Sequence, residues 1–119
     1  MKKILITDDA MFMRVTLKNI LTSAGYTDLD EAGNGQEAVD KCASAKHDLV
    51  ILDITMPVMD GLTAAKTIKA KHPDMQIIMC TAMGQKDMVM EAIKAGAKDF
   101  IVKPFQPDRV IESVKKIIG

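Results

Sequence analysis

The feature that most constrains this chain is an uninterrupted apolar run at residues 49–52 that ends at an aspartate, Asp53. Consecutive apolar residues without helical spacing predict a strand that is buried on both faces. Pro57 cannot continue a central strand, and Asp60-Gly61 signals a turn or a helix start, so we expect the chain to leave the sheet soon after Asp53. Asp53 therefore lies where a core strand meets solvent, and we expect it to be the reactive residue of the protein.

Strand and helix patterns alternate along the rest of the chain. Short apolar runs predict four more strands, at residues 3–7, 29–32, 75–80 and 100–102. Apolar residues with one-face spacing predict five helices, with the core positions Met13, Leu17, Ile20, Leu21 and Ala24; Ala38, Cys42 and Ala45; Gly61, Ala64, Ala65 and Ile68; Met88, Ala92 and Ala95; and Val110, Ile111, Val114, Ile117 and Ile118.

This alternation predicts a doubly wound α/β fold with a five-stranded parallel sheet covered by helices on both faces. The second strand carries Asp30 and Glu31, which suits a sheet edge better than the centre. An edge position for that strand gives the order 2-1-3-4-5, as in flavodoxin-like folds, and puts the ligand site beyond the carboxyl ends of strands one and three.

Length and charge limit the classes of protein. The 119 residues suit one domain, which we expect to span residues 1–119 without a linker. Sixteen basic and sixteen acidic residues cancel, so global charge does not favour nucleic acid or an anionic membrane surface as a partner. The apolar runs are too short for a membrane span or a signal peptide, and we expect a cytoplasmic protein. Cys42 and Cys80 lie in apolar patterns without metal-site spacing, which predicts buried reduced thiols.

Polar residues end four of the predicted strands: Asp8 with Asp9, Asp53, Thr81 and Lys103. Because the carboxyl ends of parallel strands meet at one edge of a sheet, we expect these side chains to share a shallow pocket. Crowded carboxylates repel one another and favour a hard divalent cation such as Mg²⁺. The lysine and the hydroxyl suit phosphoryl oxygens, so the set predicts phosphoryl transfer with Asp53 as nucleophile.

Each of these residues also has an ordinary structural interpretation. Asp8 or Asp9 alone is more often a helix cap or a solvated turn residue, and Thr81 is equally suited to cap the fourth helix. A lone lysine before proline, like Lys103, is usually a solvated loop residue. The functional interpretation depends on the conjunction, with one partner on each strand in the right order.

With these residues the sequence resembles a response-regulator receiver domain over its whole length. Four stretches carry the resemblance: Ile4-Leu5-Ile6-Thr7-Asp8-Asp9; Leu52-Asp53-Ile54-Thr55-Met56-Pro57 with Asp60-Gly61; Cys80-Thr81-Ala82; and Phe100-Ile101-Val102-Lys103-Pro104-Phe105. The resemblance implies the same fold and strand order, so these two predictions are not independent.

The resemblance also implies that Asp53 accepts a phosphoryl group from the phosphohistidine of a histidine kinase. It implies that Asp9, Asp53 and the backbone carbonyl of Thr55 bind Mg²⁺, and that Asp8 assists through water. Such a protein phosphorylates and dephosphorylates itself and is not a turnover enzyme. We expect a monomer.

Further implied roles concern the response to phosphorylation. Lys103 and Thr81 contact the phosphoryl group, the bond between Lys103 and Pro104 is cis, and Thr81 and Phe100 move as a switch. Many relatives carry Tyr where this chain has Phe100, so no phenol hydroxyl is present there. We also hypothesise that apolar Met83 slows loss of the phosphoryl group, because the family adjusts attack by water at that position.

The expected single domain leaves no room for an effector domain, so the output is expected to be surface contact. Among single-domain receivers, the chain is most similar to chemotaxis regulators that bind the flagellar motor switch, which implies a chemotaxis kinase, a motor switch protein and a phosphatase as partners. A phosphorelay receiver and the excised receiver of a larger regulator remain alternatives.

A rival from another class is a phosphatase or phosphotransferase that acts on a small substrate through an aspartyl-phosphate. Such enzymes need a second acid for the leaving group, and no acid stands two residues after Asp53. A nucleotide- or flavin-binding domain is a weaker hypothesis still, because no glycine-rich phosphate loop follows the first strand.

Overall fold

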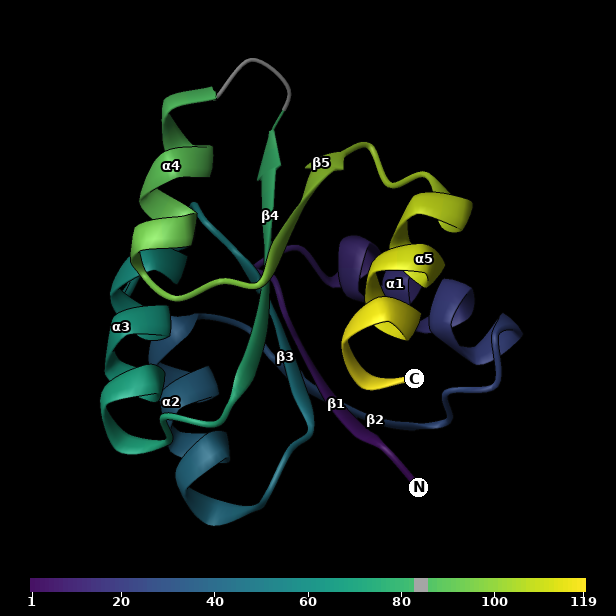
Figure 1. Cartoon of the computed structure of the whole chain (residues 1–119), viewed down its shortest axis with the longest axis horizontal. Helices are drawn as coiled ribbons and strands as arrows, with labels where there is room; N and C mark the ends of the chain where they lie inside the picture. The colour runs from purple at the N-terminus through teal and green to yellow at the C-terminus, as the bar shows by residue number, and fades with distance from the viewer. Residues whose placement is uncertain (83–85) are drawn as a thin grey trace.

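The computed structural model describes residues 1–82 and 86–119, so Met83 and its hypothesised effect lie outside the described residues. A parallel five-stranded sheet forms the centre of the molecule (Figure 1). Its strands are β1 (Lys3–Thr7), β2 (Asp28–Ala32), β3 (Leu49–Asp53), β4 (Gln76–Ala82) and β5 (Asp99–Lys103). They lie in the order β2-β1-β3-β4-β5, with the acidic β2 at an edge, so the predicted fold class and strand order are confirmed.

Helices cover both faces of the sheet. They are α1 (Met11–Ser23), α2 (Gly35–Ser44), α3 (Gly61–Lys71), α4 (Lys86–Lys94) and α5 (Pro107–Ile118). Helices α1 and α5 lie on one face, and α2, α3 and α4 lie on the other (Figure 1). Every residue of β3 is buried, as its apolar run predicts.

The sheet separates two hydrophobic cores, because alternate residues of a strand point to opposite faces. In β1, Leu5 packs into the core under α2, α3 and α4, whereas Ile4 and Ile6 pack into the core under α1 and α5. Cys42 and Cys80 are buried and free, which confirms the prediction of reduced thiols.

Helix ends also follow the sequence signals. Gly25 and Gly96, which follow α1 and α4, have φ angles of +94° and +105°, a region that favours glycine. The Asp60 carboxylate caps α3 by accepting the Thr63 N–H at 2.7 Å. Pro107 lies in the first turn of α5, where its missing N–H costs no intrahelical hydrogen bond.

Several strand boundaries differ from the prediction by one or two residues, and the end of β4 differs most. The strand expected at residues 75–80 runs from Gln76 to Ala82, so Thr81 lies inside β4 and does not cap α4, which begins at Lys86. The reason is pairing with β5, which continues through Thr81↔Val102 and Ala82↔Lys103. Backbone hydrogen bonds thus extend the strand past its first polar residue. Within the described residues, no helix has both the length and the apolar character that crossing a membrane requires.

Candidate functional site

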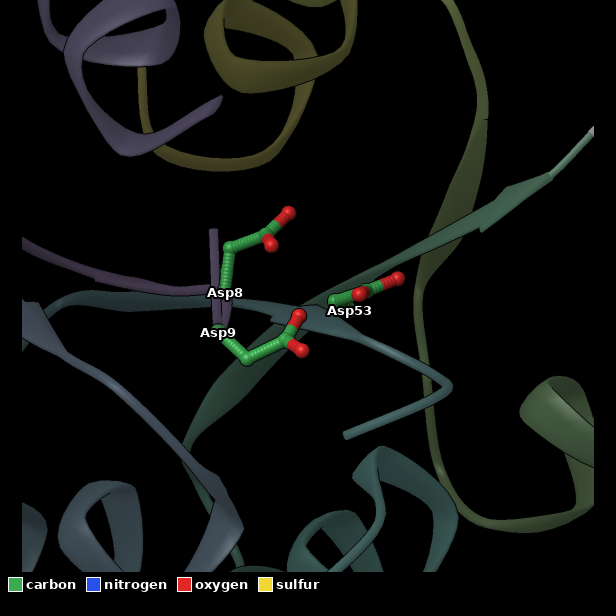
Figure 2. A group of neighbouring side chains, drawn as sticks. All are labelled: Asp8, Asp9 and Asp53. Atoms are coloured by element: carbon green, nitrogen blue, oxygen red, sulfur yellow. The ribbon is translucent and has the colours of Figure 1, made fainter. Parts of the chain in front are cut away.

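The register of the central strands brings the predicted acids together. Thr7 and Leu52 are partners in β1 and β3, so the next residues, Asp8 just after β1 and Asp53 at the end of β3, lie side by side. Asp9 follows on the same turn. One carboxylate oxygen of each of the three aspartates lies within 4.8 Å of the others (Figure 2).

The three acids differ in their exposure. Asp8 and Asp53 are 1% and 7% exposed, whereas Asp9 is exposed to solvent. Oxygen donors at the mouth of a half-buried site suit Mg²⁺, which binds one or two carboxylates and keeps several waters. The donor set therefore fits a divalent cation held partly by protein and partly by water.

Lys103 supplies a positive charge to this cluster. Its ammonium lies 2.7 Å from Asp8 Oδ2 and 3.2 Å from Asp53 Oδ2. Burial alone lowers the pKa of Lys103, but its hydrogen bond to Asp8 and the charge of Asp53 outweigh burial, so the pKa is raised. Lys103 is therefore not a solvated loop residue: it is the counter-ion of two carboxylates.

Asp53 is held in an environment that disfavours its charge. Burial is the largest cause that raises its pKa, Lys103 opposes burial, and the charges of Asp8 and Asp9 raise the pKa further. A carboxylate in this position is stabilised by any added cation.

Each polar atom of Asp8 has a partner. Its Oδ2 accepts from Lys103, and its Oδ1 accepts the N–H of Ala10 at 2.9 Å. The N–H of Asp8 donates to Ala32 O at 3.2 Å, and the carbonyl of Asp8 accepts from Arg14 Nη1 at 2.6 Å. Asp8 is thus not a solvated turn residue.

The first turn of α3 lies directly against the acceptor strand. The N–H of Gly61 donates to the Ile54 carbonyl at 2.8 Å, and a Cβ atom at Gly61 would lie 2.1 Å from the carbonyl oxygen of Asp53. Only glycine allows this approach. The first turn of α3 is therefore packed against the backbone of Asp53 and Ile54.

The other predicted site residues lie on β4, on β5 and in the loops after β3 and β5. Thr81 is buried in β4, one residue beyond the Asp53↔Cys80 pair, and its hydroxyl donates to Ala82 O at 3.3 Å. Thr55 is exposed in the loop after β3. Phe100 is half-buried near the start of β5, paired with Met79 and away from the carboxyl ends of the strands. The bond from Lys103 to Pro104 is cis.

The contact of Arg14 with Asp8 was not predicted from the sequence. Arg14 lies on α1, and its second partner is Glu31 on β2, 17 positions away in the sequence. Acids on β2 predicted only an edge strand, because neither spacing nor composition indicates which helix a strand-edge carboxylate contacts.

Known proteins resemble this chain over nearly its full length. A sequence model described as the response regulator receiver domain matches residues 4–115. The chemotaxis protein CheY of Thermotoga maritima is 59% identical over 116 residues, which cover 98% of this chain and 97% of that protein. CheY of Bacillus subtilis is 56% identical over 117 residues and 98% of each chain.

A solved structure supports the same relation. A chain in the crystal structure of the CheX-CheY-BeF3-Mg²⁺ complex from Borrelia burgdorferi has a TM-score of 0.93 and 38% identity, and the match covers 99% of this chain and 90% of that one. Fold, site geometry and sequence identity therefore agree, and this chain belongs to the response regulator receiver family and is similar throughout to the chemotaxis protein CheY.

Proposed function

We propose that this chain is a phosphoryl-accepting signalling switch in which Asp53 receives a phosphoryl group from a histidine kinase. The observation that carries the proposal is the convergence of Asp8, Asp9 and Asp53 around the ammonium of Lys103. Phosphoryl transfer needs a positioned nucleophile and cations that match the developing charge, and this cluster supplies both requirements.

In the reaction, an Asp53 carboxylate oxygen attacks phosphorus, the phosphorus–nitrogen bond to the kinase histidine breaks, and the electron pair stays on that histidine. Bound Mg²⁺ supplies charge neutralisation for the phosphoryl oxygens. Asp9, Asp53 and the carbonyl of Thr55 are the proposed ligands, with Asp8 acting through water. Lys103 leaves its carboxylate partners to contact a phosphoryl oxygen, and the Thr81 hydroxyl donates to another.

The proposed output is binding to the flagellar motor switch. Full-length similarity to CheY proteins supports it. Exposed apolar side chains on α4 and β5, Met90, Ile93 and Val102, offer a contact surface on elements adjacent to Thr81 and Phe100. Phosphorylation adds about one negative charge and strong acceptor oxygens, which bias such a surface through differential contacts.

The test is a phosphorylation experiment. The protein is incubated with phosphoramidate or acetyl phosphate and Mg²⁺, and its intact mass is recorded beside those of Asp53→Asn and of Asp108→Asn, a control at an exposed aspartate of α5. We expect one added phosphoryl group in the wild type and in Asp108→Asn, and none in Asp53→Asn. Steady release of phosphate without a labelled protein would instead favour the small-substrate phosphatase.

A second experiment tests the output. Motor-switch peptides are used to capture the protein with and without phosphorylation. Capture that increases on phosphorylation supports motor control, whereas phosphoryl transfer to a histidine protein without peptide capture supports a relay.

A further inference from the structure

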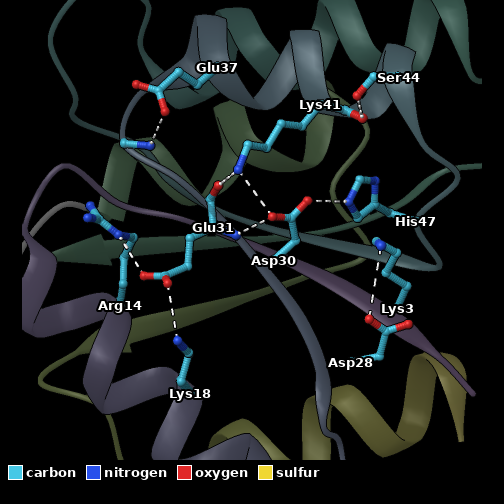
Figure 3. A network of polar contacts seen from close by, with 11 residues as sticks. Lys3, Arg14, Lys18, Asp28, Asp30, Glu31, Glu37, Lys41, Ser44 and His47 are labelled. Carbon is cyan, nitrogen blue, oxygen red and sulfur yellow. Dashed lines mark hydrogen bonds and ion pairs between the residues drawn. The ribbon is translucent and has the colours of Figure 1, made fainter.

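Arg14 connects the acidic site to the edge of the sheet. Its Nη1 donates to the carbonyl oxygen of Asp8 at 2.6 Å, and its Nε donates to Glu31 Oε1 at 3.0 Å. Figure 3 shows the Arg14 guanidinium directed at the Glu31 carboxylate, and Lys18 Nζ holds the other oxygen of that carboxylate at 3.1 Å. The Arg14 side chain is 16% exposed, so these bonds are partly protected from solvent.

The carbonyl that Arg14 contacts belongs to the peptide unit between Asp8 and Asp9. A peptide unit is planar, so fixing its oxygen fixes the direction of its N–H as well and limits ψ of Asp8 and φ of Asp9. Those two dihedral angles set how the two carboxylates lie relative to each other. Arg14 thus acts on the geometry of two of the three acids without touching either carboxylate.

The other side of Asp8 is held by the same strand that carries Glu31. The Asp8 N–H donates to the carbonyl of Ala32, the residue after Glu31. Edge strand β2 therefore holds Asp8 twice, directly through Ala32 and indirectly through Glu31 and Arg14. A planar guanidinium suits this double contact, because its donors point in fixed directions.

We propose that Arg14, oriented by Glu31, is a positioning residue that presets the Asp8–Asp9 turn for binding a divalent cation. The inference rests on the proposed function in taking that cation to be Mg²⁺. Charge alone makes the opposite prediction: removing a cationic side chain close to the acids strengthens their attraction for Mg²⁺. Loss of the preset Asp8–Asp9 geometry instead weakens Mg²⁺ binding. The direction in which the dissociation constant changes therefore distinguishes the two causes.

The experiment measures Mg²⁺ affinity by isothermal titration calorimetry, without any phosphodonor, for the wild type, Arg14→Gln, Arg14→Lys and Glu31→Gln. Removal of a residue that orients metal ligands typically weakens binding 10- to 100-fold, and we expect the dissociation constant of Arg14→Gln to rise about tenfold. Glu31→Gln leaves Arg14 in the chain but removes the carboxylate that orients it, so its dissociation constant also rises; loss of the Glu31 charge acts in the same direction, so the Arg14 variants separate the two causes. Arg14→Lys keeps the charge but reaches one of the two acceptors, so it restores affinity only in part.

Arg109 offers a matched control on α5. Its guanidinium also contacts one carboxylate and one carbonyl, Asp99 Oδ1 and Phe100 O, both at 2.9 Å. Arg109→Gln removes an equivalent pair of bonds at the opposite end of β5 from Lys103, so we expect its Mg²⁺ affinity to stay within about twofold of the wild type. Urea unfolding in EDTA reports the stability that each variant loses.

The possible results distinguish failure of this inference from failure of the proposed function. Arg14→Gln with unchanged or tighter Mg²⁺ binding would overturn the inference, and so would an equal loss in Arg109→Gln, which would indicate general destabilisation. Should Arg14→Gln not fold, Arg14→Lys decides, because it keeps the charge: an affinity equal to that of the wild type would overturn the inference. A wild type that does not bind Mg²⁺ would refute the proposed function together with this inference, whereas a wild type that binds Mg²⁺ with the affinity of the Arg14 variants would refute the inference alone.

Discussion

Replacing Lys103 with methionine tests the electrostatics of the acidic site most directly. The change keeps the length and apolar stem of the side chain and removes the ammonium that lies 2.7 Å from Asp8 and 3.2 Å from Asp53. Because the side chains of these aspartates are only 2% and 9% exposed, water does not replace the lost charge. We therefore expect Lys103→Met to destabilise the metal-free protein.

The size of the effect follows from burial. Removing one partner of a fully buried ion pair costs about 3–5 kcal/mol, because an uncompensated charge is left behind. Lys103 is 21% exposed, which reduces this cost by screening, so we expect a loss of about 2–3 kcal/mol at pH 7. The pKa of Lys103 is raised in the folded state, so its contribution is complete at pH 7 and is lost only as pH rises through that raised pKa.

The assay is urea unfolding of wild type and Lys103→Met, with EDTA and with excess Mg²⁺. Mg²⁺ binds only the folded site and brings two positive charges to the same carboxylates, so we expect it to recover most of the loss. Lys116→Met is the control, since Lys116 contacts Asp99 at 3.8 Å and is 65% exposed. The reasoning is refuted if Lys103→Met equals the wild type in EDTA, or if its loss is the same with and without Mg²⁺.

Three further predictions concern the neighbouring loop and β5. Val58 has a φ of +68°, which β-branched residues strongly disfavour, so Val58→Asn should raise the free energy of unfolding by about 1 kcal/mol. A variant that is less stable than the wild type would contradict backbone strain at Val58. Gly61→Ala places a Cβ 2.1 Å from Asp53 O, so it should lower the free energy of unfolding by about 1–3 kcal/mol and slow phosphorylation, as measured by intact mass. Unchanged phosphorylation would show that α3 need not lie so close to Asp53. Burial raises the pKa of Asp99, but hydrogen bonds from Arg109, Ser113 and the Phe100 N–H outweigh burial and lower it to about 2 from 3.8. Its stabilisation, about 1–2 kcal/mol, is complete above pH 4 and is lost as pH falls through about 2, so the stability difference between wild type and Asp99→Asn should shrink over that range in acid titrations followed by circular dichroism.

Much of the fold could be predicted because buried strands and helices have recognisable apolar patterns in the sequence. The apolar run before Asp53 indicated a strand buried on both faces, and the acids of β2 indicated an edge, which together fix the strand order. The meeting of Asp8 and Asp53 followed from that order, since parallel strands end at one side of a sheet. The resemblance to receiver domains implied the same fold and strand order.

The contacts of individual polar side chains could not be predicted from such patterns. Nothing in the pattern around Lys103 distinguishes a solvated lysine from one that contacts two carboxylates, because the difference depends on rotamers and on strands far away in sequence. The same holds for the contact of Arg14 with Glu31, and for His47, whose Nε2 lies 3.2 Å from Asp30 Oδ2 (Figure 3). Pairing with β5 likewise extended β4 beyond the boundary that polarity suggested.

The reach of Lys103 has a mechanical consequence. It extends from β5 to Asp8 beside β1, although two other strands, β3 and β4, lie between β5 and β1 in the sheet. This one side chain therefore acts as a crosslink between strands that share no backbone hydrogen bonds. A protein that docks on β5 and favours one position of Lys103 changes the affinity of the acids for Mg²⁺, and thermodynamic reciprocity requires Mg²⁺ to change the affinity for that protein by the same factor.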